Sequence, residues 1–487
     1  MGKKEDHHVI DIPSLAQELR VQLASLKSST ERVGGGAVQP CIVVDRVGEL
    51  TRNVDPHEYV PQFVSIGPYH RTGNLVRGAD KVSYLHAVLS AAAAYSGAPL
   101  DLEVYLTEMA LLEGRVRSCY AQSVDIPSRE FVRMLLLDAC YILVRFGDVL
   151  GRRPEPPAAT AANGLAQAGN RVVPSEEKRK AAVVDQREAV AVVRDVFYLA
   201  ENQIPFFVVD KIHQLTFLDS KTPALEAIAR YAHDLLRWTE YTVATPTVVA
   251  PPALRPEPAN LLHLLHMHFT PTVLSSVKGS RGVFGGGRPV GRWRTATECY
   301  FAGVKFKRRA LSTNGGGARS ILDVKVSRGG GTLQVPRLNI DAETWRLLRN
   351  LMALEQSNPS GAGSHVTAYC VFMSQLACTA RDVELLSRRG VIVHGLGNHG
   401  EVADLFANLC KGAVFDFDDA YQNYLRPACQ TLERRFRSRP RRWMAWLKQK
   451  YFINPWLAAG LAAAAIGLVC TVIQAVYSVL SYSQPGN

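Results

Sequence analysis

The 487-residue sequence lacks several patterns that identify common classes of protein. Its nine cysteines are widely scattered, with no C-x-x-C pair and an odd total, which disfavours a disulfide framework or a zinc knuckle. The opening residues, MGKKEDHHVIDIPS, carry charges but no apolar core, so they do not resemble a secretory signal, and Asp6 stands where a myristoylation motif has Ser or Thr. No N-x-S/T sequon with a permitted middle residue occurs. Together these absences predict a cytosolic, reducing environment.

Motifs for the commonest catalytic chemistries are also missing. The sequence contains no G-x-S-x-G nucleophile elbow, no Walker loop and no H-E-x-x-H zinc motif. The sequence therefore contains no usual marker for nucleophilic hydrolysis, P-loop phosphoryl transfer or this type of metal catalysis. We expect a protein that is not an enzyme and that uses no cofactor and no metal.

The composition is that of a folded protein with an uneven positive charge. Hydrophobic residues make up 47% of the chain and charged residues 21%, which is enough apolar material for a large core. Of the net charge of +12, the stretch 431–450 carries +7, because eight basic residues oppose only Glu433. The eight are Arg434, Arg435, Arg437, Arg439, Arg441, Arg442, Lys448 and Lys450. Since this excess lies beside a hydrophobic segment, it favours contact with lipid, and no nucleic-acid partner is expected.

The longest apolar run predicts a transmembrane helix over 456–480. It has 25 residues without a charge, whereas roughly 20 are enough to cross the hydrocarbon core, and Pro455 suits a helix start. The residues expected to span the membrane include Trp456, Leu457, Ala458, Ala459, Gly460, Leu461, Ile466, Leu468, Val469, Val472, Ile473, Val476, Val479 and Leu480. A buried core helix is the alternative for this run, and a nuclear-localisation or nucleic-acid patch is the alternative for the basic stretch.

The basic residues also predict an orientation. Lys and Arg close to a membrane end are retained on the cytoplasmic side, which leaves the bulk of the chain in the cytosol and 481–487 outside. We therefore expect a single-pass, tail-anchored protein of the plasma membrane or the endoplasmic reticulum. Its expected partners are the lipid bilayer and an unidentified protein, and its oligomeric state is open.

Shifts in composition divide the chain into five parts. Triple glycine ends a flexible arm over 1–36, and a helical domain follows over 37–430. Loop insertions rich in Pro, Gly and Ala interrupt that domain near 151–175, 245–258 and 279–331. A basic juxtamembrane segment over 431–455, the helix at 456–480 and a short tail over 481–487 complete the chain.

Periodicity predicts a mainly α (α+β) fold, a helical body with a small β region and one C-terminal transmembrane helix. Apolar residues at helical spacing predict helices at 80–94, 102–120, 128–149, 176–200, 341–356, 366–378, 380–389 and 401–411. Alternation with period two predicts strands at 303–309, 320–326 and 332–340.

Several stretches, in order along the chain, resemble a plant family known as domain of unknown function 247. They are YVPQFVSIGPYH at 59–70, AENQIPFFVVDKI at 200–212, AGVKFKRR at 302–309, LRNLMALEQ at 348–356, RDVELLSRRGVIVHGLG at 381–397 and YFINPW at 451–456. The resemblance covers roughly residues 41–480. CIVVDRVGEL departs from the family's usual Arg-Val-Pro turn, and GADK at 78–81 stands where a Met-Glu pair near a Lys is usual.

The resemblance implies a plant membrane protein with no established catalytic residues, in a family whose grass members include some linked to self-incompatibility. The leading hypothesis is therefore a non-enzymatic, membrane-anchored component that acts in recognition or signalling through protein contacts. A membrane-tethered enzyme of unrecognised class is the alternative hypothesis.

The central motif contains the polar residues most in need of explanation. Glu201, Asn202 and Gln203 lie between apolar segments, and Pro205 ends the preceding helix, so these side chains are expected to be buried and hydrogen-bonded to its last carbonyls and to neighbouring loops. They serve as a structural family motif in this interpretation. A pair of Glu201 and Glu355 acting as acid and base is the functional alternative.

Two further patterns can be interpreted as ligand sites or as plain structure. A G-x-G-x-x-G after VIVH, formed by Gly395, Gly397 and Gly400, matches a dinucleotide loop, but no βαβ unit is evident. The family resemblance favours a plain helix-to-helix turn. Three histidines in LLHLLHMHF, at spacings that do not share one helix face, are expected to be packing residues: His263, His266 and His268.

Overall fold

The computed structural model describes ten stretches of the chain. They are residues 42–71, 78–96, 101–149, 187–218, 223–243, 257–272, 293–313, 317–419, 422–438 and 455–483. All of them belong to the larger of two units, Ile42–Asn487. Most described residues are helical and few lie in strands, which confirms the predicted mainly α fold with a small β region.

Several predictions fall on other residues. The arm at 1–36 and the loop at 151–175 lie outside the described residues, as does most of the connector at 245–258. The same holds for five of the eight basic residues, Arg439, Arg441, Arg442, Lys448 and Lys450.

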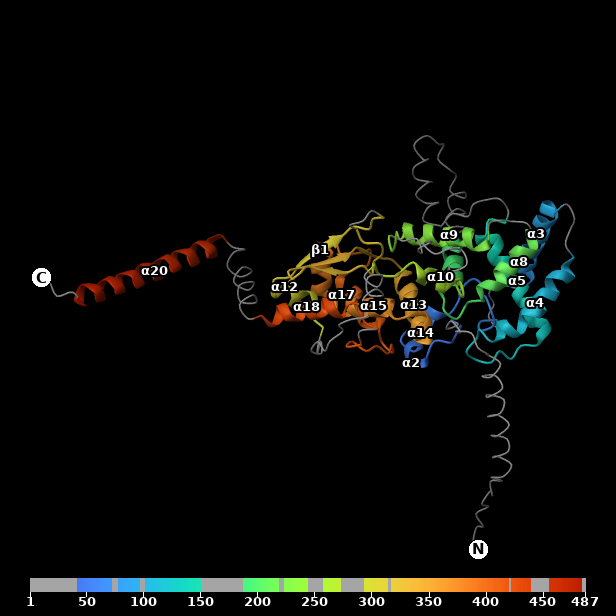
Figure 1. The fold of residues 1–487 in the computed structure, drawn as a ribbon, viewed down its shortest axis with the longest axis horizontal. Coiled ribbons are helices and arrows are strands. Elements are labelled where there is room, and N and C mark those ends of the chain that lie inside the picture. The colour runs from blue at the N-terminus through green and yellow to red at the C-terminus, as the bar shows by residue number, and fades with distance from the viewer. Residues whose placement is uncertain are drawn as a thin grey trace, which may run out of the picture. The chain divides into compact units, whose positions relative to one another are not determined.

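Helix α5, Ser128–Phe146, is the centre of the N-terminal half. It is buried on almost every side, because FVRMLLLDACYILV carries apolar residues around most of its circumference. Helices α3, Gly78–Ser96, α4, Leu102–Arg117, and α8, Phe206–Thr216, pack against it (Figure 1). Helix α9, Ala224–Trp238, packs against α5 and α8 through an apolar face.

Helix α13, Thr344–Ser357, has the same position in the C-terminal half. Its residues from Thr344 to Glu355 are buried, apart from Arg346. It packs against α10, Leu261–Met267, α15, His365–Leu376, and α17, His399–Leu409 (Figure 1). The other helical elements are α2, Glu49–Arg52, η1, Pro56–Tyr59, η3, Arg194–Tyr198, α12, Ala296–Phe301, α14, Pro359–Ala362, α16, Ala380–Arg388, α18, Arg426–Arg437, and α20, Pro455–Ser483.

Two small sheets accompany these helices. In the first, β1, Lys305–Arg309, lies parallel to β3, Thr332–Pro336, and β2, Lys325–Val326, lies antiparallel to β3, in the order β1-β3-β2. In the second, β4, Leu338–Ile340, lies parallel to β5, Ile392–His394. The predicted β region is thus confirmed, but the strand expected at 332–340 divides at Arg337 between the two sheets.

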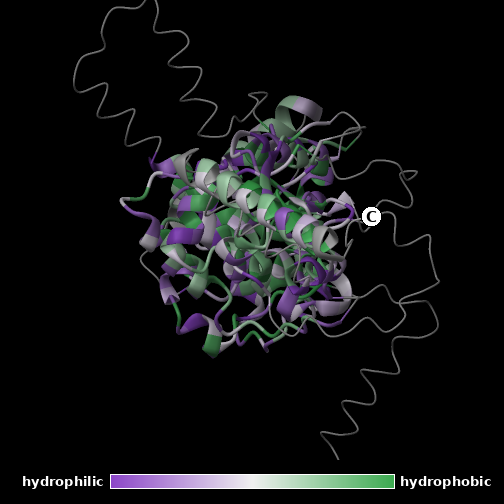
Figure 2. Ribbon diagram, turned by 90° about the vertical axis from the view of Figure 1, so that its left-hand side faces the viewer, coloured by the Kyte–Doolittle hydropathy of each residue, from purple (hydrophilic) through white to green (hydrophobic). Residues whose placement is uncertain are grey.

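One continuous hydrophobic cluster joins the two halves. It contains buried residues from Ile42 to Leu432, and its large fully buried side chains include Phe131 and Phe406. Figure 2 shows the apolar, green helices in the interior of the body and purple segments toward its periphery. Burial of this apolar surface is the main favourable contribution to folding.

The helix expected at 176–200 ends earlier than predicted. It is described from residue 187, changes to the π-helical turn η3 at Arg194, and stops before Leu199. Side-chain amides replace the missing backbone donors, since Asn202 donates to the Asp195 carbonyl and Gln203 to those of Val196 and Leu199.

Helices α8 and α9 were not expected from the sequence. Each follows a proline at its N-cap position, Pro205 and Pro223. Proline lacks a backbone N–H, but the first turn of a helix has no intrahelical acceptor for that group, so the residue is tolerated at a helix start. These prolines therefore mark the start of a helix, in addition to the end of the preceding segment.

Helix α18 crosses the predicted boundary at 430 and packs on the body. Its Leu432 and Glu433 are buried, and Arg294 binds both carboxylate oxygens of Glu433 at 2.8 and 3.1 Å. Arg435, one of the eight basic residues, donates to the Ala302 and Gly303 carbonyls. The packed body therefore includes Arg434, Arg435 and Arg437, of which Arg434 and Arg437 are exposed.

A substitution at Gly67 tests one close approach between the two family segments at 59–70 and 200–212. Gly67 has a φ of +73°, and a Cβ there would lie 2.5 Å from the Gln203 carbonyl oxygen. We expect Gly67→Ala to lower the free energy of unfolding by about 2 kcal/mol or more, measured by urea denaturation of detergent-solubilised protein. Gly114→Ala, on an exposed and open helix position, is the matched control and should stabilise by up to about 1 kcal/mol. Equal effects of both substitutions would contradict this interpretation.

Candidate functional site

Gln203 connects two elements, η3 and α10, through its side-chain amide. Its Nε2 donates to the carbonyls of Val196 and Leu199, both at 2.9 Å, and so completes the end of η3. Its Oε1 accepts the N–H groups of Leu261 and Leu262 at 3.0 and 3.2 Å, at the start of α10. Because the side chain is 1% exposed, all four contacts form away from water.

Asn202 and Asp195 hold the segment 62–66, which forms no helix or strand. The Asp195 carboxylate accepts the N–H groups of Gln62, Phe63 and Val64, the last two at 2.6 and 2.9 Å. Asn202 accepts the N–H of Ile66 at 2.7 Å and donates to the Val64 carbonyl at 3.0 Å. These two side chains therefore supply the hydrogen bonds that a strand partner would otherwise provide.

Glu201 is a buried carboxylate surrounded by donors. Its Oε1 accepts the Val47 N–H at 2.7 Å and a hydrogen bond from Arg52, and its Oε2 lies 3.2 Å from His70 Nε2. Burial by itself would raise the pKa of this carboxyl group, but the bonds from His70, Arg52 and Val47 outweigh it and lower the pKa below the usual value. The carboxylate is therefore ionised, and its hydrogen bonds hold the N-terminal segment in place.

Lys81 and Asp138 form a second buried pair on the same segment. Lys81 Nζ lies 2.5 Å from both Asp138 Oδ1 and the Ser65 carbonyl, and Asp138 Oδ2 accepts the Gly67 N–H at 2.8 Å. Lys81 is the lysine of the GADK stretch at 78–81. This stretch departs from the family's usual pattern, but its lysine still makes a structural contact. The polar groups of Lys81 and Asp138 therefore hold the backbone of this segment in place.

Glu355 lies in a separate cluster from Glu201. Its carboxylate accepts the N–H groups of Val366 and Thr367, the Thr367 hydroxyl at 2.7 Å, and a hydrogen bond from His266 Nε2 at 2.8 Å. The structure thus gives the two carboxylates different partners, and it does not assemble them as an acid and base.

His365 joins this cluster and was missed by sequence reasoning. Ligand atoms of His266, Glu355 and His365 lie within 4.8 Å of one another, and all three residues are buried. Burial lowers the pKa of each imidazole to about 4 and raises that of the Glu355 carboxyl, so the imidazoles are neutral at physiological pH. This donor set suits a zinc-like ion, but four hydrogen bonds already occupy Glu355, and an ion would have to displace the one to His266.

The other two predicted histidines have packing contacts. His268 Nδ1 lies 2.9 Å from the Leu264 carbonyl of its own helix, and His263 Nδ1 accepts the Ala259 N–H at 3.1 Å. Only His266 of the three reaches the cluster. No sequence signal could have found His365, because it lies on α15, far from His266 in the sequence.

The G-x-G-x-x-G segment connects strand β5 to helix α17, so the expected helix-to-helix turn is wrong. Asn398 caps α17 by accepting the Glu401 N–H at 2.9 Å, and a Cβ at Gly397 would lie 3.6 Å from the Glu401 carboxylate. A side-chain cap and a carboxylate thus occupy the helix start where a pyrophosphate would bind.

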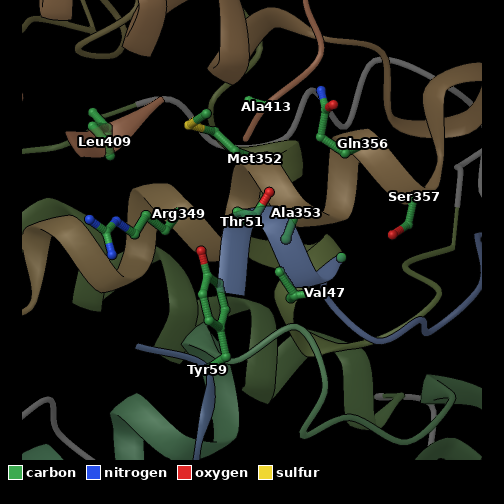
Figure 3. A pocket seen from close by; sticks show the side chains of 11 residues that line it. Val47, Thr51, Tyr59, Arg349, Met352, Ala353, Gln356, Ser357, Leu409 and Ala413 are labelled. Atoms are coloured by element: carbon green, nitrogen blue, oxygen red, sulfur yellow. The ribbon is translucent and has the colours of Figure 1, made fainter. Parts of the chain in front are cut away.

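A small cavity lies between α2, η1, α13 and the chain after α17. It has a volume of about 40 Å³. Figure 3 shows the Tyr59 hydroxyl pointing toward α13, between Arg349 and Thr51. Neither Tyr59 nor Arg349 was singled out in the sequence, where each resembles an ordinary core or surface residue.

The predicted membrane-spanning residues all lie in helix α20. The window Ala462–Val479 has a mean hydropathy of 1.9 and is 0% buried. Apolar side chains on it, such as Ile466 and Leu468, are 65% and 69% exposed. By length and composition, this helix can cross a membrane.

These features define a class of protein: a mainly helical body with buried polar motifs, followed by one apolar helix long enough to span a bilayer. The chain belongs to the plant family domain of unknown function 247, described as plant protein of unknown function, whose model matches residues 44–470. The resemblance found in the sequence is therefore confirmed.

Two relatives from Arabidopsis thaliana are similar to the chain. UPF0481 protein At3g47200 is 23% identical over 463 residues, which cover 90% of this chain and 86% of the relative. Putative UPF0481 protein At3g02645 is 25% identical over 180 residues, which cover 37% and 32%. No solved structure matches the chain.

An amide deletion tests the structural role of the central motif. Asn202→Ala removes three hydrogen bonds and leaves the Ile66 N–H unpaired in a buried site. We expect a loss of about 3 kcal/mol in the free energy of unfolding, measured by urea denaturation. Asn398→Ala, which removes an exposed cap bond, is the control and should cost about 1 kcal/mol. A smaller loss for Asn202→Ala than for Asn398→Ala would refute the assignment.

The buried histidines predict that acid destabilises the fold. Burial lowers the pKa of His266, His268 and His365 to about 4, from a reference value of 6.5. Their contribution to stability is therefore complete above pH 6.5 and is lost as the pH falls toward 4, by up to about 1.4 kcal/mol per pH unit for each group. The raised pKa of the Glu355 carboxyl offsets part of this loss of stability, because that group contributes most to folding at low pH.

The measurement is urea denaturation of solubilised protein between pH 7 and pH 5. The free energy of unfolding should decrease over this range, and His268→Asn should reduce the slope. His57→Asn, at an exposed position, is the matched control for the replacement of a histidine. A free energy that rises on acidification would contradict the prediction.

Proposed function

We propose that the protein is a non-enzymatic, membrane-anchored component that acts in recognition or signalling through protein contacts of its cytosolic body. In its finer form, the proposal places this recognition in a self-incompatibility reaction. The apolar helix α20 is the observation that carries the proposal.

The length and exposure of α20 support a membrane position. At 29 residues it is about 43 Å long, which exceeds the roughly 30 Å of a hydrocarbon core. Its apolar side chains are exposed, and an apolar surface of this extent is unfavourable in water. Lipid is the environment that relieves this cost, and the basic residues before the helix favour the cytosolic side for the body.

The buried state of the polar motifs supports a role without catalysis. Glu201 and Glu355 are 0% and 1% exposed, and hydrogen bonds within the protein hold both carboxylates. A metabolite turned over by purified protein, at a rate abolished by Glu201→Gln or Glu355→Gln, would overturn this part of the proposal. The alternative, a membrane-tethered enzyme, would then take its place.

Charged substitutions in α20 test the anchor. We expect the full chain to stay in the membrane pellet after carbonate extraction, and the double variant Leu468→Lys, Ile473→Lys to move to the supernatant. Each lysine at the centre of a bilayer costs about 2.5–3.5 kcal/mol on insertion scales. The control is Leu111→Lys with Leu218→Lys, at exposed positions of the body, which should remain in the pellet.

The orientation of the chain in the bilayer can be measured in the same membranes. A glycosylation acceptor added after Asn487 should be modified, because the tail is expected outside, whereas an acceptor placed within 151–175 should not be. Extraction of the unmodified chain by carbonate, or glycosylation of the 151–175 acceptor, would contradict the proposed topology.

A further inference from the structure

The three-stranded sheet has one buried face and one exposed face. Phe306 of β1 and Leu333 and Val335 of β3 are buried in the hydrophobic core. Because side chains alternate along a strand, Lys305 and Lys307 of β1 lie on the opposite face, and both are exposed. The outer face of β1 therefore carries positive charge.

The strand register extends this positive charge across the sheet. Lys307 pairs with Gln334 of β3, and Gln334 pairs with Lys325 of β2, which is also exposed. Arg328, in the turn from β2 to β3, is a fourth exposed basic residue. Since neighbouring strands lie about 4.8 Å apart, Lys307 and Lys325 are separated by about 10 Å. We call Lys305, Lys307, Lys325 and Arg328 the basic face.

No negative charge balances the basic face. The strands and the turn, residues 305–309 and 325–336, contain no Asp or Glu, and no carboxylate of the described residues forms an ion pair with any of the four basic side chains. Asp323, just before β2, is buried, and Glu433 of α18 is already bound by two arginines. Positive charges at this spacing repel one another, and an anionic surface relieves that repulsion.

Lysines on edge strands have a second use, because they prevent the sheets of separate molecules from pairing. Strands β1 and β2 are the two edges of this sheet. That role can be served by charged side chains of either sign. A face that carries basic residues alone therefore indicates a partner with negative charge.

The basic face lies next to the end of α18, from which the chain continues toward α20. Arg435, in the last turn of α18, donates to the carbonyl of Gly303, two residues before β1, at 3.0 Å. A Cβ at Gly330, in the turn from β2 to β3, would lie 3.0 Å from the Thr431 carbonyl oxygen. Residues 438–454 connect α18 to α20 and can span at most about 60 Å. The sheet is therefore within reach of any bilayer that holds α20.

We propose that the basic face binds the anionic headgroups of the membrane that holds α20, so that the three-stranded sheet lies on the cytosolic leaflet. The inference rests on the proposed function, because α20 is what brings this face to lipid. Cytosolic leaflets carry anionic lipids and attract basic side chains close to the membrane. A nucleic acid would also match the charge, but the short connection to α20 favours lipid.

The test uses the full chain in nanodiscs and measures the acetylation rate of single lysines by mass spectrometry. One set of nanodiscs contains phosphatidylcholine, and the other contains phosphatidylcholine with about 30% phosphatidylglycerol, lipids that have no reactive amine. Lys305, Lys307 and Lys325 should react at least threefold more slowly in the anionic nanodiscs, and about 1 M sodium chloride should remove the difference. Lys411, exposed and outside the sheet, is the internal control and should react equally in both.

Charge reversal tests whether the basic face acts as one surface. The double variant Lys307→Glu, Lys325→Glu should make the acetylation rate of Lys305 equal in the two kinds of nanodisc. The matched control, Lys411→Glu with Arg129→Glu, makes the same change in charge at exposed positions outside the sheet and should keep Lys305 protected. Since all four replaced side chains are exposed, both variants should keep the melting temperature within about 2 °C of the unmodified chain.

Three outcomes would overturn the proposal. These are equal acetylation rates of the three lysines in neutral and anionic nanodiscs, retained protection of Lys305 in the double variant, and protection by a single-stranded oligonucleotide with none by phosphatidylglycerol. Carbonate extraction tests the proposed function separately. A chain that resists extraction, but whose lysines react equally in both kinds of nanodisc, would refute this inference alone.

Discussion

The need to provide hydrogen-bond partners for the backbone of one buried, irregular segment governs much of this structure. The segment 59–70 contains Pro61 and Pro68, which prevent it from forming a helix or a central strand, yet Val64 and Ile66 are buried. Its N–H groups cannot be left unpaired in the core. Asp195 and Asn202 supply the acceptors, and this explains why two family segments distant in the sequence form a single packed unit.

The same solution recurs where the N-terminal segment meets helix α13. Asn350 accepts the Ala200 N–H and donates to the Glu58 carbonyl, while Asn358 exchanges two hydrogen bonds with Val43. Side-chain amides suit this task because each offers both a donor and an acceptor. The polar residues of the motifs thus stabilise the fold by joining its two halves, and this use accounts for their burial.

Sequence reasoning was most successful where local periodicity decides the structure. The long helices and the small sheets follow from spacing, and burial of Glu201, Asn202 and Gln203 follows from their apolar flanks. It failed where distant residues decide: side-chain amides shorten the helix before Leu199, and β5 forms because it pairs with β4, so VIVH could not be assigned locally. The cluster at Glu355 and the cavity at Tyr59 likewise require residues from separate helices, which no spacing rule relates.

The pattern of satisfied polar groups is incomplete at several buried positions, among them the hydroxyls of Tyr59 and Tyr369. The buried amides and carboxylates of the motifs have partners, but the Tyr59 hydroxyl, close to the cavity between α2, η1 and α13, has no hydrogen bond. The site lies between α13 and η1, next to the segment that Asn350 holds in place, so its geometry depends on the same contacts as the fold.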